Sequence, residues 1–207
     1  AGRRKGTFFV DNPPASADVA RELAAAARRR SVGFIDAPVS GGQEGAQNGA
    51  LTVMVGGSPE DFARGEAAMQ SFAKAVTHMG PVGSGQLTKM VNQICCACSI
   101  QALAEGMNFA VKSGLDPHQV IDVISKGAAQ SWQMENRAET MIDDKFEFGF
   151  AVEWMQKDLG IALTEAHSNS ALLPVTALVD QFYAQVAAMG GKRWDTSSLL
   201  RLLTRKS

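Results

Sequence analysis

The chain has 207 residues, of which 45% are hydrophobic and 20% are charged, and its 20 lysines and arginines against 21 acidic residues give a formal net charge of -1. This supplies a hydrophobic core for one ordinary domain or two small ones, and the absence of a basic excess argues against a nucleic-acid-binding domain. No run of 18 apolar residues predicts a transmembrane helix and no secretory leader is recognisable, so we expect a cytoplasmic protein.

The first 80 residues alternate short apolar runs with short helical patterns. Ser16 is expected to cap the first helix, over residues 16–30, and Ser58 the helix that follows Pro59. The predicted strands cover residues 6–11, 32–36, 50–55 and 75–78. Such alternation predicts a largely parallel α/β sheet, which we assign to a domain over residues 1–83.

From Ser84 onward the pattern is entirely helical, which predicts an all-α domain over residues 84–207. Its first helix, over residues 87–112, would be roughly 39 Å long at 1.5 Å per residue, and Asp116 is expected to cap the next one. The other helices are predicted at about residues 131–142, 151–168, 174–189 and 195–204. Because the long helix is apolar nearly all round, it must be covered on every side, in part by a second subunit.

Three cysteines, Cys95, Cys96 and Cys98, lie together in this long helix. Their spacing closes no disulfide on a regular helix, and no histidine joins them at the spacing of a zinc site. We therefore expect buried structural thiols in a reducing compartment.

Lys89 lies one turn from the start of the long helix, and Glu105 is the single charge in the 22 residues between Lys89 and Lys112. Burial and the positive end of a helix both lower the pKa of a lysine, toward the range useful for proton transfer. Asn92 and Gln93, at i+3 and i+4, share its helix face. The residues alone are equally compatible with a lysine that only snorkels to water.

Two glycine-rich segments are candidate anion sites. The backbone amides of residues 80–86 (GPVGSGQ) could receive an anion before the long helix, or the segment could be a tight turn between domains. In the segment DAPVSGG at residues 36–42, Ser40, Gly41 and Gly42 could grip a carboxylate, or form a plain turn after a strand.

Later positions are less decisive. Lys157 and Asp158 are neighbours that do not share a helix face, so we expect no internal salt bridge, and two solvated charges are the simpler interpretation. Trp132 and Phe150 could belong to the core or to a pocket wall, the core being the simpler choice. A glycine-rich dinucleotide fingerprint G-x-G-x-x-G is absent from these 207 residues.

Three motifs together resemble the β-hydroxyacid dehydrogenase family, the family of 3-hydroxyisobutyrate dehydrogenases and tartronate semialdehyde reductases. DAPVSGG (36–42) is similar to its substrate-binding signature, GPVGSGQLTKMVN (80–92) to its catalytic signature, and KDL (157–159) to its late, cofactor-proximal one. The 6-phosphogluconate dehydrogenases are a poorer match, because they carry histidines where Gln86 and Asn92 stand here.

The resemblance implies hydride transfer between NAD or NADP and a small 3-hydroxyacid or its semialdehyde, without a metal, in a homodimer or homotetramer. Lys89 would be the general acid/base. Substrate-binding residues would be Ser40, Gly41, Gly42, Asn92, Gln93 and Trp132, and cofactor-binding residues Phe150, Lys157 and Asp158.

The chain departs from the family pattern in two places. It starts after the family's glycine-loop unit, so it would hold the C-terminal half of a Rossmann-like domain, on the order of 80 residues of that domain being absent. It also has Asn12, Pro13 and Pro14 where relatives usually have Ser-Thr, whose threonine contacts the cofactor. The competing interpretation is a non-catalytic truncated fragment that acts only as a helical assembly module.

Overall fold

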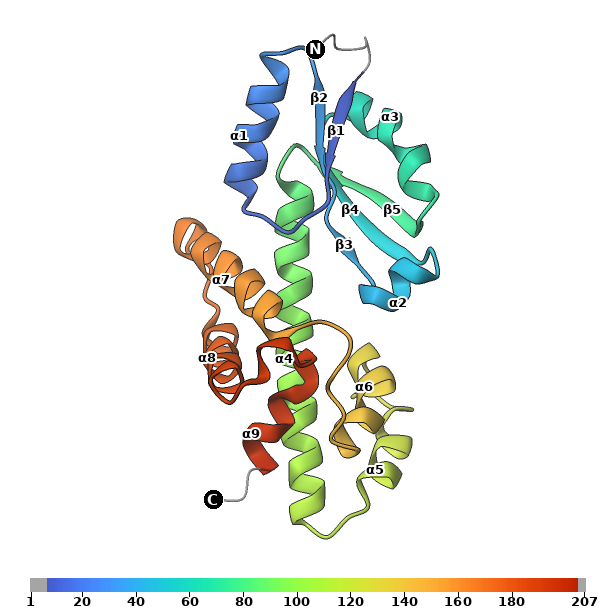
Figure 1. The fold of residues 1–207 in the computed structure, drawn as a ribbon, viewed down its shortest axis with the longest axis vertical. Helices are drawn as coiled ribbons and strands as arrows, with labels where there is room; N and C mark the ends of the chain where they lie inside the picture. Colours follow the sequence, from blue (N-terminus) through green and yellow to red (C-terminus); the bar gives the residue numbers. More distant parts are fainter. Residues whose placement is uncertain (1–6, 205–207) are drawn as a thin grey trace. The chain divides into compact units, whose positions relative to one another are not determined.

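A computed structural model of the chain describes residues 7–204, and it divides into two units, Ala1–Asn92 and Gln93–Ser207 (Figure 1). Each unit has a core of its own: a sheet with helices in unit 1, and helices in unit 2. This confirms the predicted fold class, an α/β region followed by an all-helical one. The predicted domain boundary between residues 83 and 84 stays a prediction.

The described part of unit 1 contains one mixed sheet. β1 pairs with β2 and β4 pairs with β5 in parallel, whereas β4 runs antiparallel to both β2 and β3. Its strands are β1 (Phe8–Asp11), β2 (Gly33–Asp36), β3 (Val39–Ser40), β4 (Leu51–Gly56) and β5 (Ala73–Gly80). The prediction of a largely parallel sheet was therefore wrong in part, because the short connection from β3 to β4, which contains α2 (Gly42–Gln47), reverses the chain instead of crossing over.

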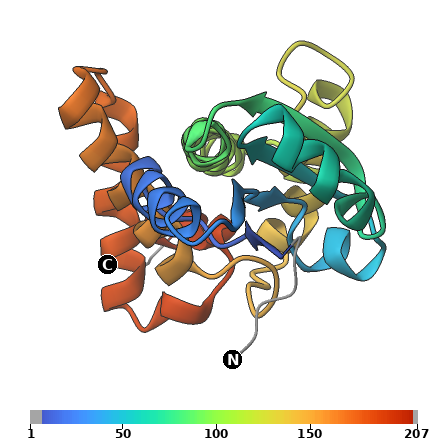
Figure 2. The same cartoon turned by 90° about the horizontal axis from the view of Figure 1, so that it is seen from above.

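The helices α1 (Ala17–Arg28) and α3 (Pro59–Gln70) flank β1 and β2 on opposite sides (Figures 1 and 2). Successive side chains of a strand point to opposite faces, so Phe34 packs with the buried alanines of α1 while Ile35 packs with Met69 of α3. Ser16 and Ser58 cap the two helices by accepting from the backbone N–H three residues on, as predicted.

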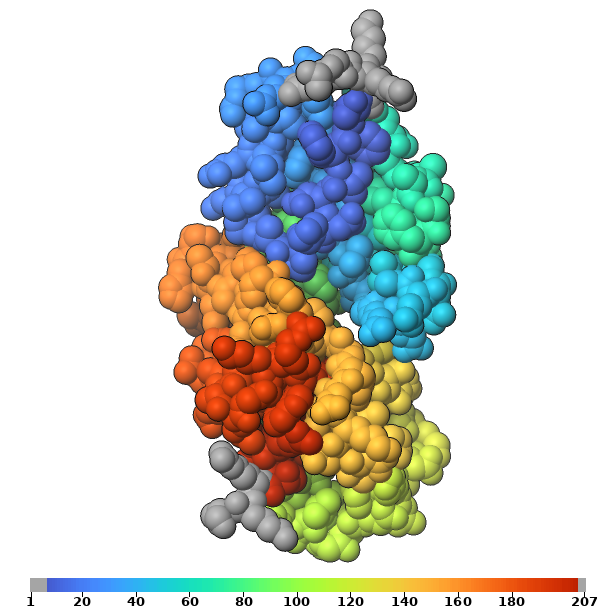
Figure 3. Space-filling model, viewed as in Figure 1, coloured from blue at the N-terminus to red at the C-terminus, as the bar shows by residue number. Residues whose placement is uncertain are grey.

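The helices of unit 2 enclose one hydrophobic core. It contains Ile100 and Leu103 of α4 together with side chains from every other helix of the unit, Tyr183 being among the most deeply buried. These helices are α4 (Ser84–Lys112, which begins in unit 1), α5 (Pro117–Ile124), α6 (Trp132–Ile142), α7 (Val152–Asn169), α8 (Pro174–Ala188) and α9 (Leu200–Thr204). Figure 3 shows α7 and α8, in orange, beside α9, in red, on one face of this unit.

The predicted burial of the cysteines was wrong in part, because Cys95 is exposed and Cys96 and Cys98 are half-buried, all three as free thiols. α4 is also long and apolar enough to cross a membrane by length and composition alone. The core helix of a folded domain passes the same test, and Ile100 and Ala104 of α4 lie in the unit 2 core.

Candidate functional site

The start of α4 is tied to the end of β2 by one buried carboxylate. Asp36, which is fully buried, accepts hydrogen bonds from the backbone N–H of Gly83 (2.7 Å to Oδ1) and of Gln86 (3.0 Å to Oδ2). An acidic side chain at a helix N-terminus satisfies amides that have no partner within the helix and interacts favourably with the helix dipole. The N–H groups of Gly83 and Gln86 in the glycine-rich segment 80–86 are therefore already used within unit 1, and both the anion site and the turn between domains stay predictions.

The glycines around this carboxylate are required for close packing. A Cβ on Gly85 would lie 2.4 Å from the carbonyl oxygen of Met54, and a Cβ on Gly56 would lie 2.5 Å from Oδ1 of Asp36. Only a residue without a side chain lets α4 approach the sheet this closely. Gly56 and Gly85 thus have a packing role that the sequence pattern did not indicate.

Gln86 fixes the loop that follows β1. Its buried side chain donates from Nε2 to the carbonyl of Pro13 (2.9 Å) and accepts at Oε1 from the N–H of Ala15 (3.0 Å). Asn12 donates from Nδ2 to the carbonyl of Ala37 (2.8 Å). Asn12 thus ties the ends of β1 and β2 together.

Lys89 lies in the first turns of α4 and is buried, with 8% of its surface exposed. Asn92, one turn later, is half-buried, and Gln93 is buried at the next position. Burial of a lysine side chain is costly unless polar groups surround its ammonium, so this burial argues against a lysine that extends into water, and its catalytic role stays a prediction.

The segment that carries Ser40 joins β3 to α2. Ser40 is half-buried and pairs with Thr52 of β4. Gly41 (φ 132°) and Gly42 (φ 60°) have backbone conformations that L-residues rarely adopt, and both are exposed. The turn thus joins a half-buried serine to two exposed glycines, and its role as a carboxylate site stays a prediction.

In unit 2, Asp158 joins two predicted site residues. Its Oδ2 accepts a 2.6 Å hydrogen bond from Nε2 of Gln93, and its Oδ1 lies 2.9 Å from Nζ of Lys157. Asp158 is buried, whereas the Lys157 side chain is 41% exposed. Our prediction that these neighbours form no salt bridge was wrong, because the long lysine side chain bends back across the helix.

Neither Trp132 nor Phe150 is fully buried, although the core was the simpler of our two expectations for them. Trp132 is 49% exposed and Phe150 is half-buried against the unit 2 core. Two residues that sequence reasoning missed adjoin them: Arg137, which stacks on the Trp132 ring, and the buried Asp195, which accepts from the N–H of Phe150. Only the bonds of Asp195 with Ser197 are local, whereas its partners Phe150 and Arg137 are distant in the sequence.

Carboxylates at the ends of β1 and β2 lie close together. Burial and, to a smaller extent, the negative charge of Asp36 raise the pKa of Asp11 above its ordinary value.

Among residues 7–204, no cluster of three or more histidine, cysteine, aspartate or glutamate side chains could hold a metal ion.

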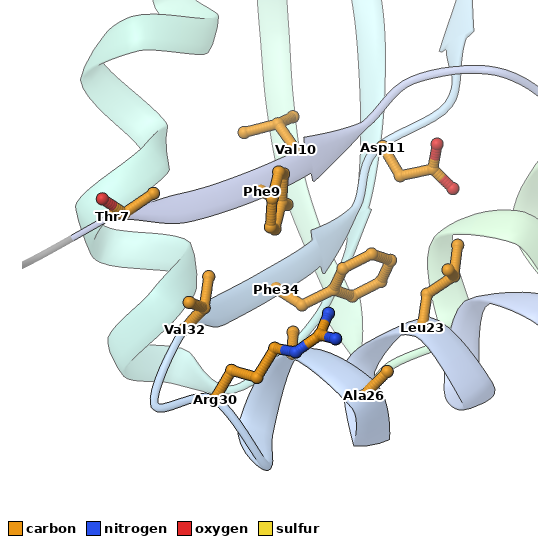
Figure 4. A pocket seen from close by; sticks show the side chains of 10 residues that line it. Thr7, Phe9, Val10, Asp11, Leu23, Ala26, Arg30, Val32 and Phe34 are labelled. Atoms are coloured by element: carbon orange, nitrogen blue, oxygen red, sulfur yellow. The ribbon is translucent and has the colours of Figure 1, made fainter. Parts of the chain in front are cut away.

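A separate groove of about 430 Å³ lies between β1 and α1 (Figure 4). Its wall is mainly apolar, with Phe9, Leu23 and Phe34 lining it together with Arg30. No residue of the three motifs lines it. Within the described residues β1 pairs with β2 alone, so the groove runs along an open sheet edge and lies apart from the candidate catalytic residues.

Comparisons with known proteins cover nearly the whole chain. Residues 1–80 match a model described as the NAD binding domain of 6-phosphogluconate dehydrogenase, and residues 83–203 match one described as the NAD-binding domain of NADP-dependent 3-hydroxyisobutyrate dehydrogenase.

An uncharacterized oxidoreductase of Shewanella frigidimarina is 58% identical over 99% of this chain and 70% of its own length. The 2-hydroxy-3-oxopropionate reductase of Escherichia coli is 37% identical over 96% of this chain and 68% of its own. Among solved structures, Mycobacterium tuberculosis 3-hydroxyisobutyrate dehydrogenase with L-serine superposes with a TM-score of 0.89 at 30% identity, over 98% of this chain and 72% of that one.

Proposed function

Because the chain belongs to the β-hydroxyacid dehydrogenase family, whose members are NAD(P)-dependent oxidoreductases, we propose that it interconverts a small 3-hydroxyacid and its semialdehyde or keto form with Lys89 as the general acid/base. The observation that carries this proposal is the Asp36 link. The two hydrogen bonds of Asp36 join the end of β2 to the start of α4, the helix that carries Lys89. The motif that contains Ser40 and the motif that contains Lys89 are thus held together in one part of the fold.

In the oxidation direction, the carbon that carries the hydroxyl group gives up its hydrogen as a hydride. When the cofactor is bound, C4 of the nicotinamide would accept this hydride. The hydroxyl proton passes to neutral Lys89, which returns a proton to the carbonyl oxygen in the reverse reaction. The side-chain amides of Asn92 and Gln93 would orient the reacting oxygen or the ammonium.

The substrate carboxylate would bind at the turn of Ser40, Gly41 and Gly42. A hydroxyl and backbone N–H groups bind a carboxylate through short, charge-assisted hydrogen bonds. The exposure of the two glycines supports this role, because neither carries a side chain that would screen its own backbone N–H group.

The residues of unit 2 fit the nicotinamide end of a cofactor. Asp158, buried and paired with both Gln93 and Lys157, holds a half-exposed ammonium in one orientation. Lys157 would then hold the cofactor from one side while Phe150 borders the ring. At the turn of residues 80–86, Asp36 takes the N–H groups of Gly83 and Gln86, so these two amides are not available to the cofactor pyrophosphate.

An assay of NAD⁺ and NADP⁺ reduction tests this proposal. 3-Hydroxyisobutyrate, glycerate, serine and 4-hydroxybutyrate should be compared as substrates with 2-hydroxyacids of equal size, following absorbance of the reduced cofactor. We expect turnover with at least one of these four and none with 2-hydroxyacids that lack a hydroxyl at a later carbon, since the relatives named for their substrates act on 3-hydroxyacids. Turnover of 2-hydroxyacids alone would contradict the assignment.

We also propose a cytoplasmic homodimer or homotetramer assembled through unit 2. Several large apolar side chains of unit 2 are exposed to solvent, among them Phe109 (71% exposed) and Leu172 (90% exposed). Such side chains are costly to leave in water when they gather on one surface, and a second copy would cover them. An assembly without turnover would instead favour the helical assembly module.

A further inference from the structure

Backbone hydrogen bonds join the segment before α7 to the segment before α9. Asp195 donates its N–H to the carbonyl of Phe146 (2.7 Å), and Thr196 donates to the carbonyl of Phe150 (2.9 Å). Val152 donates to the carbonyl of Trp194 (2.9 Å). These bonds fix the backbone on both sides of Phe150.

The carboxylate of Asp195 completes this fastening from within. It is fully buried, and its Oδ2 accepts from the N–H of Phe150 (2.9 Å) while its Oδ1 accepts from the N–H (3.0 Å) and hydroxyl (2.6 Å) of Ser197. Gly149, at φ 72°, leaves room for it, because a Cβ there would meet Oδ2 at 2.0 Å. A buried carboxylate also needs a positive partner, and Arg137 supplies it, with Nε 3.3 Å from Oδ1.

The guanidinium of Arg137 in turn supports two aromatic rings. It lies 4.8 Å from the ring centre of Trp132 and 5.1 Å from that of Phe148. Both rings are substantially exposed, so the surrounding core does not hold them in place. Their orientation is set by a cation that is itself anchored to a buried carboxylate, which is how an aromatic ring can be kept rigid on an open surface.

We propose that Arg137 and Asp195 are positioning residues that set the aromatic wall of the substrate site. Asp195 holds the backbone of Phe150, Arg137 holds the rings of Trp132 and Phe148, and their ion pair makes the two one rigid element. This rests on the proposed function, in which Phe150 borders the nicotinamide ring, and on the family resemblance, which implies that Trp132 binds the substrate. Neither positioning residue takes part in proton or hydride transfer.

The test compares Arg137→Lys with Arg201→Lys as a matched control. Arg201 makes similar ring contacts from a more exposed ion pair: it pairs with the exposed Asp144, and its guanidinium lies 4.2 Å from the ring centre of Trp194 and 4.8 Å from that of Phe146. A lysine keeps the positive charge in both variants but loses the planar group that stacks on the rings. Any effect common to the two variants therefore reflects stability and not positioning.

The first readout does not depend on turnover. With its three tryptophans replaced by 5-fluorotryptophan, the chain gives ¹⁹F resonances that single Trp→Phe variants assign. We expect Arg137→Lys to shift the Trp132 resonance and leave that of Trp194, and Arg201→Lys to do the reverse. An unmoved Trp132 resonance in Arg137→Lys overturns the positioning role.

The second readout is the steady-state rate. We expect Arg137→Lys to raise KM for the hydroxyacid about tenfold with kcat within about twofold, and Arg201→Lys to change neither. Equal KM in Arg137→Lys and wild type, or equal increases in both variants, overturns the proposal. If the unaltered chain turns over no hydroxyacid, the proposed function fails, while the ¹⁹F shifts still decide whether Arg137 orients Trp132.

Discussion

Replacing Lys89 with methionine is expected to lower kcat by about 10²- to 10⁴-fold while the chain stays folded. Methionine has a similar length and no ionisable group, so it fills the buried site without accepting or donating a proton. The expected loss is that of a general acid/base in other enzymes. Stopped-time assays of cofactor reduction measure kcat, and thermal unfolding monitors the fold.

Two further variants separate catalysis from charge. Lys89→Arg keeps a positive charge but cannot deprotonate at working pH, so it should be as inactive as Lys89→Met. Lys112→Met, at the far end of α4, should retain wild-type kcat, because that lysine is exposed and in the last turn. A Lys89→Met enzyme that keeps more than about a tenth of wild-type kcat would remove Lys89 from the chemistry.

Asp36→Ala is expected to reduce the free energy of unfolding by about 2–5 kcal/mol, because the N–H groups of Gly83 and Gln86 would lose a buried acceptor. The start of α4 would also lose its link to β2, so kcat should fall together with stability. Urea unfolding followed by far-UV circular dichroism measures the stability, with the midpoint shifted and the slope unchanged.

Asp18→Ala is the matched control for this effect. Asp18 is an exposed first-turn carboxylate that pairs with Arg21, also exposed, so its removal should cause no measurable change. Asp36→Asn should fall between wild type and Asp36→Ala, since it keeps one acceptor oxygen but turns an N–H group toward a backbone donor. If Asp36→Ala unfolded at the wild-type urea midpoint, Asp36 would not be the cap of α4.

Local patterns predicted the helices well because their signals are local. Ser16, Ser58 and Asp116 each precede a helix by one residue and accept from a backbone N–H two or three residues on. β3 and α2 were not predicted, because a two-residue strand has no periodicity and α2 (GQEGAQ) has no apolar stripe. The mixed sheet follows from these two short elements, so it too was beyond the sequence pattern.

The candidate site was predictable where the chemistry depends on residue type, and not where it depends on distant partners. Lys89 stood out as a charge on an apolar helix, and the structure buries it. Asp36 as a helix cap and Asp195 as a backbone clamp could not be read, because their partners Gln86 and Phe150 lie 50 and 45 residues away. The Lys157–Asp158 pair was misjudged, because spacing on a helix describes Cβ positions and not the reach of a lysine.

The central claim, that this polypeptide is itself a nicotinamide-dependent dehydrogenase, is tested most directly by titrating the 207-residue chain with NADH and with NADPH. Calorimetry, or energy transfer from tryptophan to the reduced nicotinamide, measures the binding. We expect saturable binding of at least one of the two, stoichiometric with the chain, and unchanged in Lys89→Met. A folded chain that binds neither would contradict the claim, and unit 2 would then be a helical assembly module.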